Sequence, residues 1–304
     1  MEISVVVPVY GCPGAVQPLC ERLSHTLSKL TNDYEIILVN DHCPKNSWTE
    51  IETQCAKNSR IIGLDLSKNY GQQKAILAGL DASSGNYVVV MDCDLQDKPE
   101  DIALLYQAIK KNDYDYVLAK IENVKSKKFT SKLFYSTYSK IMGTKIDNNI
   151  SNFGIYNRIV IDSIVSNREN SRSFVCYIKS LGFKQGFVEV VRENRFEGKS
   201  GYNFKKRLKS AEDIIFSQSN LPIGLMFKTG LILGILSFLG LIISIIACVV
   251  TKYFSLLSTL SIVFTVLLCT NIIILCISLI GNYVYRTFIE SKHKPLYHIR
   301  KRLN

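Results

Sequence analysis

The sequence predicts an α/β protein whose mostly parallel sheet has helices on both faces and is followed by an apolar membrane segment. Short apolar runs alternate with amphipathic helical patterns between Ile3 and Ala119. These runs are apolar throughout, as in strands that are buried on both faces. From Thr229 to Tyr285, a run of 57 positions, Lys252 is the only charged residue. So long an uncharged run has no place in an ordinary globular core and indicates a membrane.

The strands and helices can be placed one after another along the chain. The first strand ends near Pro8, which cuts the apolar run too short for a signal peptide. Apolar residues at helical spacing follow it, and β-branched runs then alternate with further helical patterns. We expect strands at 3–9, 35–40, 60–64, 87–91 and 114–119, and helices at 16–30, 48–57, 72–83 and 100–111.

Two membrane-spanning helices are predicted in the C-terminal third. Lys252 divides the apolar segment into two runs, each longer than the roughly 20 residues that a membrane-spanning helix needs. Lys and Arg flank both ends, so the positive-inside rule places both ends in the cytosol. A basic amphipathic stretch precedes the first run and is typical of an interfacial helix. We therefore expect a cytosolic domain at 1–201, a juxtamembrane helix at 202–222, a transmembrane hairpin at 223–285 and a basic cytosolic tail at 286–304.

The net charge of +11 is concentrated beside the apolar segment. Residues 1–198 carry 24 Lys and Arg against 23 Asp and Glu, whereas residues 199–304 carry 13 against 3. Nucleic-acid-binding proteins usually carry positive charge on a folded domain, so no nucleic-acid partner is expected. The distribution instead fits anionic lipid head groups or an anionic lipid substrate.

Several alternative classes of site lack their motifs. The nine cysteines are an odd number without a Cys-x-x-Cys pair, which predicts reduced thiols rather than disulfides or a zinc site. The first strand is not followed by the glycine pattern of dinucleotide-binding proteins. A phosphate loop ending at Gly198-Lys199-Ser200 would need a glycine at position 193, which is Glu193.

Acidic residues follow the fourth predicted strand directly. Asp92 and Asp94 come straight after it, and Asp41 follows the second strand. Parallel sheets bind ligands at the carboxyl ends of their strands. Two carboxylates there can hold Mg²⁺ or Mn²⁺ together with a diphosphate, because these cations prefer oxygen ligands. The alternative for the acidic cluster is a solvated turn before a helix.

At this point the sequence resembles the inverting GT-A glycosyltransferases of family 2, in particular those that transfer sugars to polyprenyl phosphates. The resemblance covers nearly the whole chain, including the apolar helices. The motifs that carry it are Val6-Val-Pro-Val-Tyr10, Val39-Asn-Asp41, Asn69-Tyr-Gly-Gln-Gln-Lys-Ala75, Met91-Asp-Cys-Asp-Leu-Gln-Asp-Lys-Pro-Glu100 and Arg192-x-x-Arg195-x-x-Gly198-Lys-Ser200.

The resemblance implies roles for these residues. Asp94 would ligate the metal, with Asp92 beside the ribose and the metal and Gln96 nearby. Asp41 would bind the base. The resemblance also implies a nucleotide pocket formed by Pro8, Val9, Tyr10 and Asn69, and phosphate binding by Arg192, Arg195, Lys199 and Ser200, with Arg195 in a catalytic role.

The chain departs from the family pattern at Asn152. Many relatives have an acidic residue in the corresponding motif, and an amide cannot act as a base. A phosphate monoester needs no base near neutral pH because its second pKa is about 6, so the departure favours a lipid-phosphate acceptor. Asn152 would then only donate a hydrogen bond to the substrate. A second departure is Gly201, where relatives often have lysine; Lys199 would supply that charge.

The expected reaction is inverting transfer of a sugar from a nucleotide sugar, UDP-linked by resemblance, to undecaprenyl phosphate at the inner (plasma) membrane. Two alternatives remain open. One is a membrane-anchored transferase that extends a glycan through a sugar hydroxyl, and the other is a non-enzymatic nucleotide-sugar sensor. The segment 125–142 is either an acceptor loop at the interface or a surface helix. Two apolar helices per chain are also compatible with a homo-oligomer.

Overall fold

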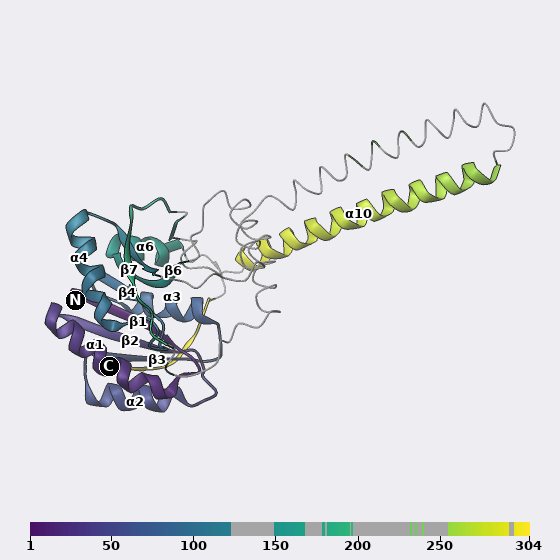
Figure 1. Cartoon of the computed structure of the whole chain (residues 1–304). Coiled ribbons are helices and arrows are strands. Elements are labelled where there is room, and N and C mark those ends of the chain that lie inside the picture. Colours follow the sequence, from purple (N-terminus) through teal and green to yellow (C-terminus); the bar gives the residue numbers. More distant parts are fainter. Residues whose placement is uncertain are drawn as a thin grey trace. The chain divides into compact units, whose positions relative to one another are not determined.

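The computed structural model describes residues 1–122, 149–167, 178–179, 181–194, 196, 255–291 and 295–304, with Ile232, Ile235 and Leu239 (Figure 1). The chain divides into two compact units. The first, here called the α/β unit, comprises 1–139, 144–206 and 295–304, and the second comprises 140–143 and 207–294. The predicted juxtamembrane helix, nearly all of the first apolar run and the segment 125–142 lie outside the described residues.

The α/β unit begins with the predicted alternation of strands and helices. Each predicted element between residues 3 and 121 is present, and most of the observed helix and strand ends lie within two residues of the expected positions. The elements are β1 (Ile3–Val9), α1 (Pro13–Leu30), β2 (Tyr34–Asn40), α2 (Ser47–Lys57), β3 (Ile61–Leu66), α3 (Gln72–Ala82), β4 (Tyr87–Val90), a 3-10 turn (Pro99–Asp101), α4 (Ile102–Asn112) and β5 (Tyr116–Ile121).

Further strands complete an eight-stranded sheet. They are β6 (Ile150–Asn157), which continues into α6 (Arg158–Asn167), then β7 (Gln185–Val190) and β8 (Ile299–Leu303). The strand order is β7-β5-β6-β4-β1-β2-β3-β8. β1 pairs in parallel with β2 and β4, β2 with β3, and β5 with β7, while β6 and β8 run antiparallel to their neighbours. The predicted α/β class with a mostly parallel sheet is thus confirmed.

Two apolar layers cover the two faces of this sheet. Alternate residues of β1 point to opposite faces, as the two-residue period of a strand requires. Val5 and Val7 pack with α1, α2 and α4, whereas Val6 packs with α3 and α6. Every residue of β1 and β2 is buried. Full burial of each such aliphatic side chain contributes about 1.5–3 kcal/mol.

One close approach fixes the distance between α3 and the sheet. A Cβ atom added to Gly79 would lie 2.3 Å from Cγ1 of Val6 and 3.2 Å from Cγ2 of Val39. A β-branched side chain has few rotamers with which to move away. The absence of a side chain at Gly79 therefore lets α3 lie directly on β1 and β2.

The start of β1 is held by α4. The hydroxyl of Tyr106 donates a hydrogen bond to the carboxylate of Glu2, and Nζ of Lys110 donates another at 3.0 Å. The hydrogen bond from Tyr106, followed by that from Lys110, lowers the pKa of Glu2 to about 2. This charged contact joins the first strand to a helix more than 100 residues away.

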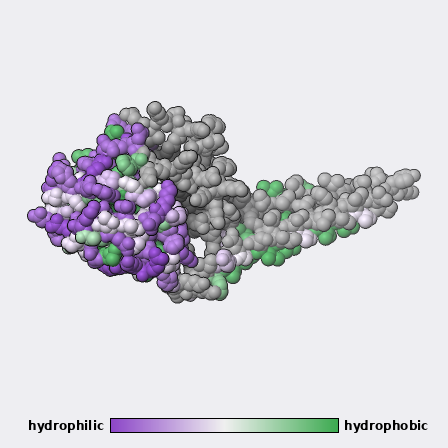
Figure 2. All heavy atoms as spheres, turned by 90° about the horizontal axis from the view of Figure 1, so that it is seen from below, coloured by the Kyte–Doolittle hydropathy of each residue, from purple (hydrophilic) through white to green (hydrophobic). Residues whose placement is uncertain are grey.

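The second unit contains the long helix α10 (Ser255–Ser291). Its described side chains include exposed apolar residues at three- and four-residue spacing, among them Ile273, Ile277, Ile280 and Val284. In Figure 2 the described part of the second unit shows hydrophobic side chains, and the α/β unit shows a mostly hydrophilic face. Over the residues that the structure describes, no helix qualifies by length and hydropathy as a membrane span.

Candidate active site

The predicted site residues gather at one edge of the sheet. β1, β2, β3 and β4 are parallel, so their carboxyl ends meet at this edge. β6 runs antiparallel to β4 and begins at the same edge, while β5 and β7 end there. Tyr10, Asp41 and Asp92 therefore follow neighbouring strands, Asn152 lies near the start of β6, and Arg192 comes just after β7. Polar loops at this edge are where ligands of such sheets bind.

The motif at the end of β1 offers one open side chain. Pro8 and Val9 are buried in the strand, whereas Tyr10 is 51% exposed. Asn69, in the loop after β3, is exposed as well. The backbone turns at Gly11, whose φ is +80°. Of the predicted nucleotide-pocket residues, Tyr10 and Asn69 thus present their side chains to solvent.

Asp41 fixes the loop between β3 and α3. Its carboxylate is buried and accepts hydrogen bonds from the backbone N–H groups of Tyr70, at 2.7 Å, and Gly71, at 2.9 Å. Burial raises the pKa of Asp41, and these two hydrogen bonds partly oppose that rise. The predicted base-binding residue is therefore itself held in place by the motif that begins at Asn69.

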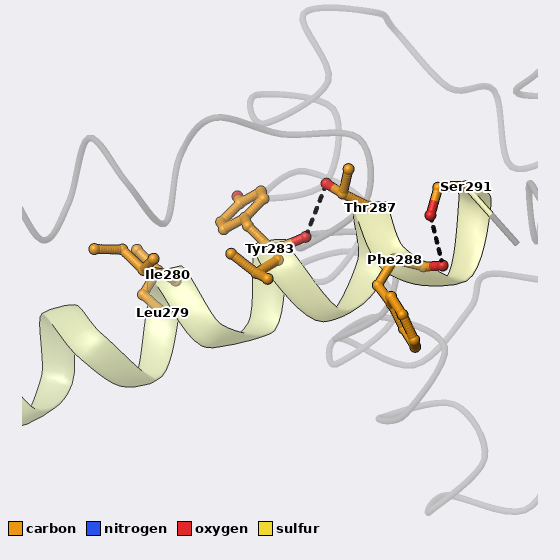
Figure 3. A pocket seen from close by; sticks show the side chains of 7 residues that line it. Leu279, Ile280, Tyr283, Thr287, Phe288 and Ser291 are labelled. Atoms are coloured by element: carbon orange, nitrogen blue, oxygen red, sulfur yellow. Dashed lines mark hydrogen bonds between the residues drawn. The ribbon is translucent and has the colours of Figure 1, made fainter.

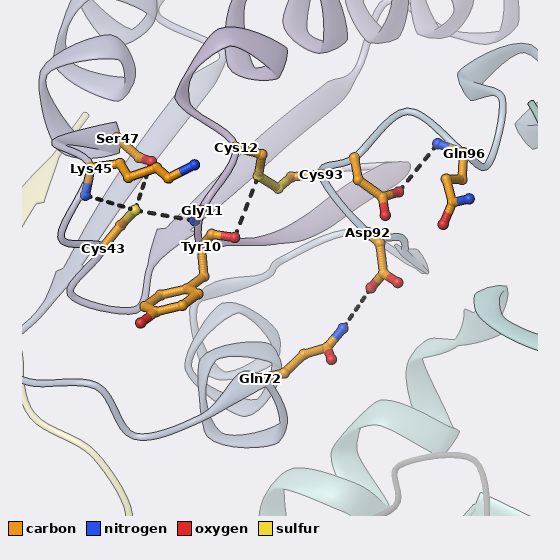
Figure 4. Close-up of a disulfide and its surroundings, with 11 residues drawn as sticks. Tyr10, Gly11, Cys12, Cys43, Lys45, Ser47, Gln72, Asp92, Cys93 and Gln96 are labelled. Atoms are coloured by element: carbon orange, nitrogen blue, oxygen red, sulfur yellow. Dashed lines mark hydrogen bonds between the residues drawn. A yellow bond between two sulfur atoms is a disulfide. The ribbon is translucent and has the colours of Figure 1, made fainter. Parts of the chain in front are cut away.

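Asp92 and Asp94 stand in the loop after β4. Residues 91–98 of this loop are alternately buried and half-buried, and Asp92, Asp94 and Gln96 are among the half-buried ones. Nε2 of Gln72 donates to Oδ1 of Asp92 at 2.6 Å (Figure 4), and the backbone N–H of Gln96 donates to Oδ1 of Asp94 at 3.2 Å. Both carboxylates are thereby oriented while remaining open to water.

The loop suits a divalent cation that takes some of its ligands from the protein and the others from a substrate. Among the described residues, no group of three or more His, Cys, Asp or Glu side chains forms a complete cage. Mg²⁺ and Mn²⁺ do not require one, since Mg²⁺ is commonly held by one or two carboxylates together with substrate phosphates and water. The two half-buried carboxylates of Asp92 and Asp94 fit that requirement, and the amide oxygen of Gln96 is a nearby oxygen atom of the kind that such cations prefer.

Arg192 is engaged inside the protein. Nε and Nη2 of Arg192 donate to the two carboxylate oxygens of Asp97 at 2.7 and 3.0 Å, and Nη2 also donates to Oγ of Ser151 at 2.7 Å. The side chain of Asp97 is 1% exposed. Burial disfavours the charge of Arg192, but the hydrogen bonds and charge of Asp97, with the charges of Asp92 and Asp94, outweigh it and raise the pKa. This arginine therefore braces the acidic loop from behind with one edge of its guanidinium.

Backbone contacts place the segment after β7 along the same loop. The N–H of Glu193 donates to the carbonyl of Gln96, and that of Phe196 donates to the carbonyl of Asp94. Of the predicted phosphate-binding and catalytic residues nearby, Arg195, Lys199 and Ser200 lie outside the described residues. The described part of this segment nevertheless runs beside the predicted metal-binding loop.

Asn152 is half-buried in β6, and its neighbours Ser151 and Phe153 are buried. Val90, the last residue of β4, pairs with Gly154. Continuing this antiparallel register by two residues brings Asn152 to the level of Asp92. The structure thus places the amide of Asn152 at the edge where the acidic loop begins.

The prediction of reduced thiols is wrong for one pair of cysteines. Cys12 and Cys93 form a disulfide with a Cα–Cα distance of 6.8 Å (Figure 4). They are 81 residues apart in sequence, but they follow the paired strands β1 and β4 at the same edge. Spacing along the chain could not reveal this neighbourhood. The disulfide joins the loop after Tyr10 to the loop that carries Asp92 and Asp94.

Cys43 lies beside this disulfide (Figure 4) and keeps its thiol. Its Sγ accepts hydrogen bonds from the N–H of Gly11, the N–H of Lys45 and the hydroxyl of Ser47. Burial opposes ionisation, but the hydrogen bonds, led by that of Ser47, lower the pKa of Cys43. The sulfur thus connects the loops after β1 and β2.

Sequence reasoning did not identify three residues that shape the site. Gln72 belongs to the motif that begins at Asn69. Its contact with Asp92 lies between segments far apart in the chain and therefore produces no pattern in the local sequence. Asp97 was quoted as part of the acidic motif without a role. Ser151 precedes Asn152 and belongs to no motif of its own. The common feature is a hydrogen bond between segments 20 or more residues apart.

A pocket of about 520 Å³ lies along α10 (Figure 3). It is lined by residues from Leu279 to Ser291 that include Tyr283 and Phe288, and none of the lining residues is ionisable near neutral pH. The hydroxyls of Thr287 and Ser291 donate to carbonyls of their own helix. No predicted site residue belongs to this pocket, so the chemistry is assigned to the edge of the sheet.

Comparison with a solved structure supports the fold of the α/β unit. Glucosyl-3-phosphoglycerate synthase from Mycobacterium tuberculosis, in complex with Mn²⁺ and uridine-diphosphate-glucose, is similar with a TM-score of 0.51 and 15% identity. The similarity covers 71% of this chain and 77% of that one. At this identity it bears on the architecture alone.

Curated relatives match over almost the full length. Undecaprenyl-phosphate 4-deoxy-4-formamido-L-arabinose transferase of Proteus mirabilis is 27% identical over 99% of this chain and 93% of its own. Bactoprenol glucosyl transferase of Shigella phage SfV is 29% identical over 99% and 98%, respectively. Residues 4–167, more than half of the chain, match the family described as glycosyl transferase family 2. The chain is therefore an enzyme, a glycosyltransferase that belongs to family 2.

Proposed function

We propose that this glycosyltransferase transfers a sugar from a nucleoside diphosphate sugar, uridine-linked, to a membrane polyprenyl phosphate with inversion at the anomeric carbon. The observation that carries the proposal is the combination found at the carboxyl edge of the sheet. Asp92 and Asp94 are held half-buried after β4, and the amide Asn152 lies at the same edge, at the position where the resemblance to the family leads us to expect an acidic residue. Such a site can activate a leaving diphosphate, but the amide at position 152 cannot deprotonate an acceptor.

A phosphate acceptor removes the need for a base. Its second pKa is about 6, so near neutral pH it is largely a dianion and attacks without losing a proton. The names of two relatives, an undecaprenyl-phosphate transferase and a bactoprenol glucosyl transferase, support the same class of acceptor. Undecaprenyl phosphate is therefore the acceptor that we propose.

The proposed reaction is a single in-line displacement. An oxygen of the acceptor phosphate forms a bond to the anomeric carbon, and the bond from that carbon to the diphosphate breaks, with its electron pair leaving on the diphosphate. Attack from the face opposite the leaving group inverts the configuration. Positioning and charge stabilisation supply the acceleration, because the nucleophile arrives ionised.

The residues have separate tasks in this reaction. Asp92 and Asp94 would hold Mg²⁺ or Mn²⁺, which would neutralise charge on the departing diphosphate. Arg192, through Asp97, keeps the acidic loop in place, and Asn152 is available to donate a hydrogen bond to the substrate. Tyr10, Asp41 and Asn69 belong to the nucleotide end of the site.

Membrane attachment is part of the proposal. The run from 229 to 285, in which Lys252 is the only charged residue, has basic flanks on both sides and supports a helical hairpin whose ends are both cytosolic. The exposed aliphatic side chains of α10 are consistent with a lipid environment. Placing the catalytic domain at the cytosolic face of the inner membrane would bring it to both a soluble donor and a lipid acceptor. A homo-oligomer formed through these helices is compatible with this arrangement.

The test uses the full chain in detergent with MnCl₂ or MgCl₂, radiolabelled nucleotide sugars and a short-chain polyprenyl phosphate. Transfer of label into the organic phase is expected with the unaltered protein and is expected to fall at least about 100-fold in Asp94→Asn. Asp33→Asn is the matched control, because Asp33 precedes β2 at the opposite edge of the sheet. Release of nucleoside diphosphate only with an added glycan, and no label in lipid, would replace the phosphate acceptor by a hydroxyl.

A further inference from the structure

The last ten residues fold back onto the α/β unit as a strand. β8 pairs antiparallel with β3, from Gly63 opposite Leu303 to Leu66 opposite Ile299. Three side chains also attach this segment to neighbouring helices and strands. The hydroxyl of Tyr297 donates to Asp81, Nζ of Lys301 pairs with Glu52 at 2.6 Å, and the amide of Asn304 donates to the carbonyls of Cys55 and Ile61. This tail is thus an integral edge of the sheet.

One contact of β8 reaches a buried charge. The guanidinium of Arg300 donates from both Nε, at 2.8 Å, and Nη2 to Oδ2 of Asp65 in β3. Asp65 is fully buried, whereas the side chain of Arg300 is 57% exposed. A buried carboxylate needs a compensating charge or several hydrogen bonds. Among the described residues, Arg300 is the cation that forms an ion pair with Asp65.

From Asp65 a chain of hydrogen bonds continues towards the nucleotide end of the site. Nδ2 of Asn40 donates to Oδ1 of Asp65 at 2.7 Å, and the N–H of Cys43 donates to Oδ1 of Asn40 at 3.2 Å. Sγ of Cys43 in turn accepts from the N–H of Gly11 at 3.1 Å. Every hydrogen bond in this chain is donated towards Asp65, from Gly11 to Cys43, from Cys43 to Asn40 and from Asn40 to Asp65.

Two members of that chain of contacts are sequence neighbours of predicted donor-binding residues. Asn40 immediately precedes Asp41, and Gly11 immediately follows Tyr10. The amide of Asn40 cannot turn over without losing its contacts with both Asp65 and Cys43, since its oxygen and nitrogen have opposite hydrogen-bonding roles. The charge of Asp65, held by Arg300, therefore fixes the orientation of Asn40 and with it the loops after β1 and β2.

We propose that Arg300 is a positioning residue for the nucleotide part of the donor, so that the strand following the apolar segment completes the donor site. The inference rests on the proposed function, because it takes the edge formed by Tyr10 and Asp41 as the nucleotide subsite. Arg300 acts through Asp65 and Asn40 and does not contact the substrate. Loss of its charge should weaken nucleotide binding and leave the rate at saturating donor unchanged.

The test is calorimetric titration of the full chain in detergent with UDP and with GDP in the presence of MnCl₂. Arg300→Gln is expected to weaken binding of the preferred nucleotide about 10-fold, the loss expected for a charge-assisted hydrogen bond. Arg300→Lys keeps the charge but lacks the paired N–H donors, so its nucleotide affinity should lie between those of the unaltered protein and Arg300→Gln. Lys301→Gln is the matched control. It removes a cation from the same strand whose ion-pair partner is Glu52 and not a member of the chain from Asp65 to Gly11, and nucleotide affinity should change less than about 2-fold.

Asp65→Asn separates positioning from loss of the strand. This variant retains the other attachments of β8, and it should weaken nucleotide binding while hydrogen exchange still shows the β3 amides protected. With Arg300→Gln it should be non-additive, because both changes interrupt the same chain of contacts. Steady-state assays should show a raised donor KM with kcat unchanged.

The outcomes distinguish this inference from the proposed function. If the unaltered protein binds neither UDP nor GDP, the proposed function fails and takes the inference with it. If the unaltered protein binds one of these nucleotides and both variants, Arg300→Gln and Asp65→Asn, bind it with the affinity of the unaltered protein, the inference alone is wrong. A loss of affinity in Lys301→Gln equal to that in Arg300→Gln would also overturn it, since the effect would then belong to the strand and not to Arg300.

Discussion

Replacing Arg192 by glutamine should destabilise the α/β unit far more than the same change at Arg22. Both arginines bind a carboxylate through Nε and Nη2, Arg192 with Asp97 and Arg22 with Glu100. They differ in burial, because the side chain of Asp97 is 1% exposed and that of Glu100 is 51% exposed. This pair of variants therefore isolates the effect of burying the carboxylate.

The expected magnitudes follow from that difference. Removing one partner of a buried ion pair costs about 3–5 kcal/mol, because the other charge is left without compensation. Arg192 itself is partly exposed and Ser151 still donates to Asp97, so we expect about 2–3 kcal/mol. For a domain of this size that corresponds to a fall in Tm of roughly 5–10 °C. Arg22→Gln removes surface ion pairs with Glu100 and Glu193 and should cost less than about 1 kcal/mol.

Thermal unfolding followed by tryptophan fluorescence is suited to the comparison. Trp48 is the only tryptophan and lies in α2, so the signal reports on the α/β unit. Adding Asp97→Asn to Arg192→Gln should recover part of the lost stability, since the uncompensated charge disappears. Equal falls in Tm for the Arg192 and Arg22 variants, or a further fall in the double variant, would refute the reasoning.

Three other predictions concern separate features. In the folded chain, hydrogen bonds from a tyrosine and a lysine lower the pKa of Glu2 to about 2 from an ordinary value of 4.5. The contribution of Glu2 to stability is therefore present above about pH 4.5 and is lost as the pH falls towards 2. Glu2→Gln should lower Tm at pH 6 and flatten the fall in Tm between pH 5 and 3. Gly79→Ala should lower stability by about 1–3 kcal/mol in a denaturant titration, because the new methyl meets Val6; an unchanged midpoint would show that α3 can shift. Gln72→Leu removes the hydrogen bond that orients Asp92 and should raise the Mn²⁺ concentration needed for half-maximal transfer about 10-fold, and an unaltered metal dependence would contradict that role.

The strands that sequence patterns predicted well are those buried on both faces. β1 and β2 are apolar at nearly every position because helices cover both sides, and such runs are distinctive. β8 carries the opposite signal: four of its five residues are exposed, and Arg300, Lys301 and Arg302 stand in its centre. Charged residues are common on edge strands, where they discourage pairing with other chains. A short basic segment of this kind is indistinguishable from a tail in the sequence alone.

The site shows a similar division between local and long-range information. The acidic motif after β4 and the departure at Asn152 are visible in short stretches of sequence, and the fold brings both to one edge of the sheet. The sequence could not show that Arg192 would contact Asp97, because that contact depends on β5 and β7 running in the same direction as β4. It could not show the pairing of Cys12 with Cys93 for the same reason, since β1 and β4 must first be neighbours.

The position of β8 constrains the apolar segment as well. The chain leaves the α/β unit at residue 206 and rejoins it at Pro295. If the apolar segment crosses a membrane as proposed, its two ends belong to one folded unit and must lie on the same side, so each crossing has to be paired with another. This requirement agrees with the basic residues on both flanks, which independently favour two cytosolic ends. If Arg300 also orients the donor site, truncating the chain after the apolar segment should impair nucleotide binding even though every residue proposed to contact the donor is retained.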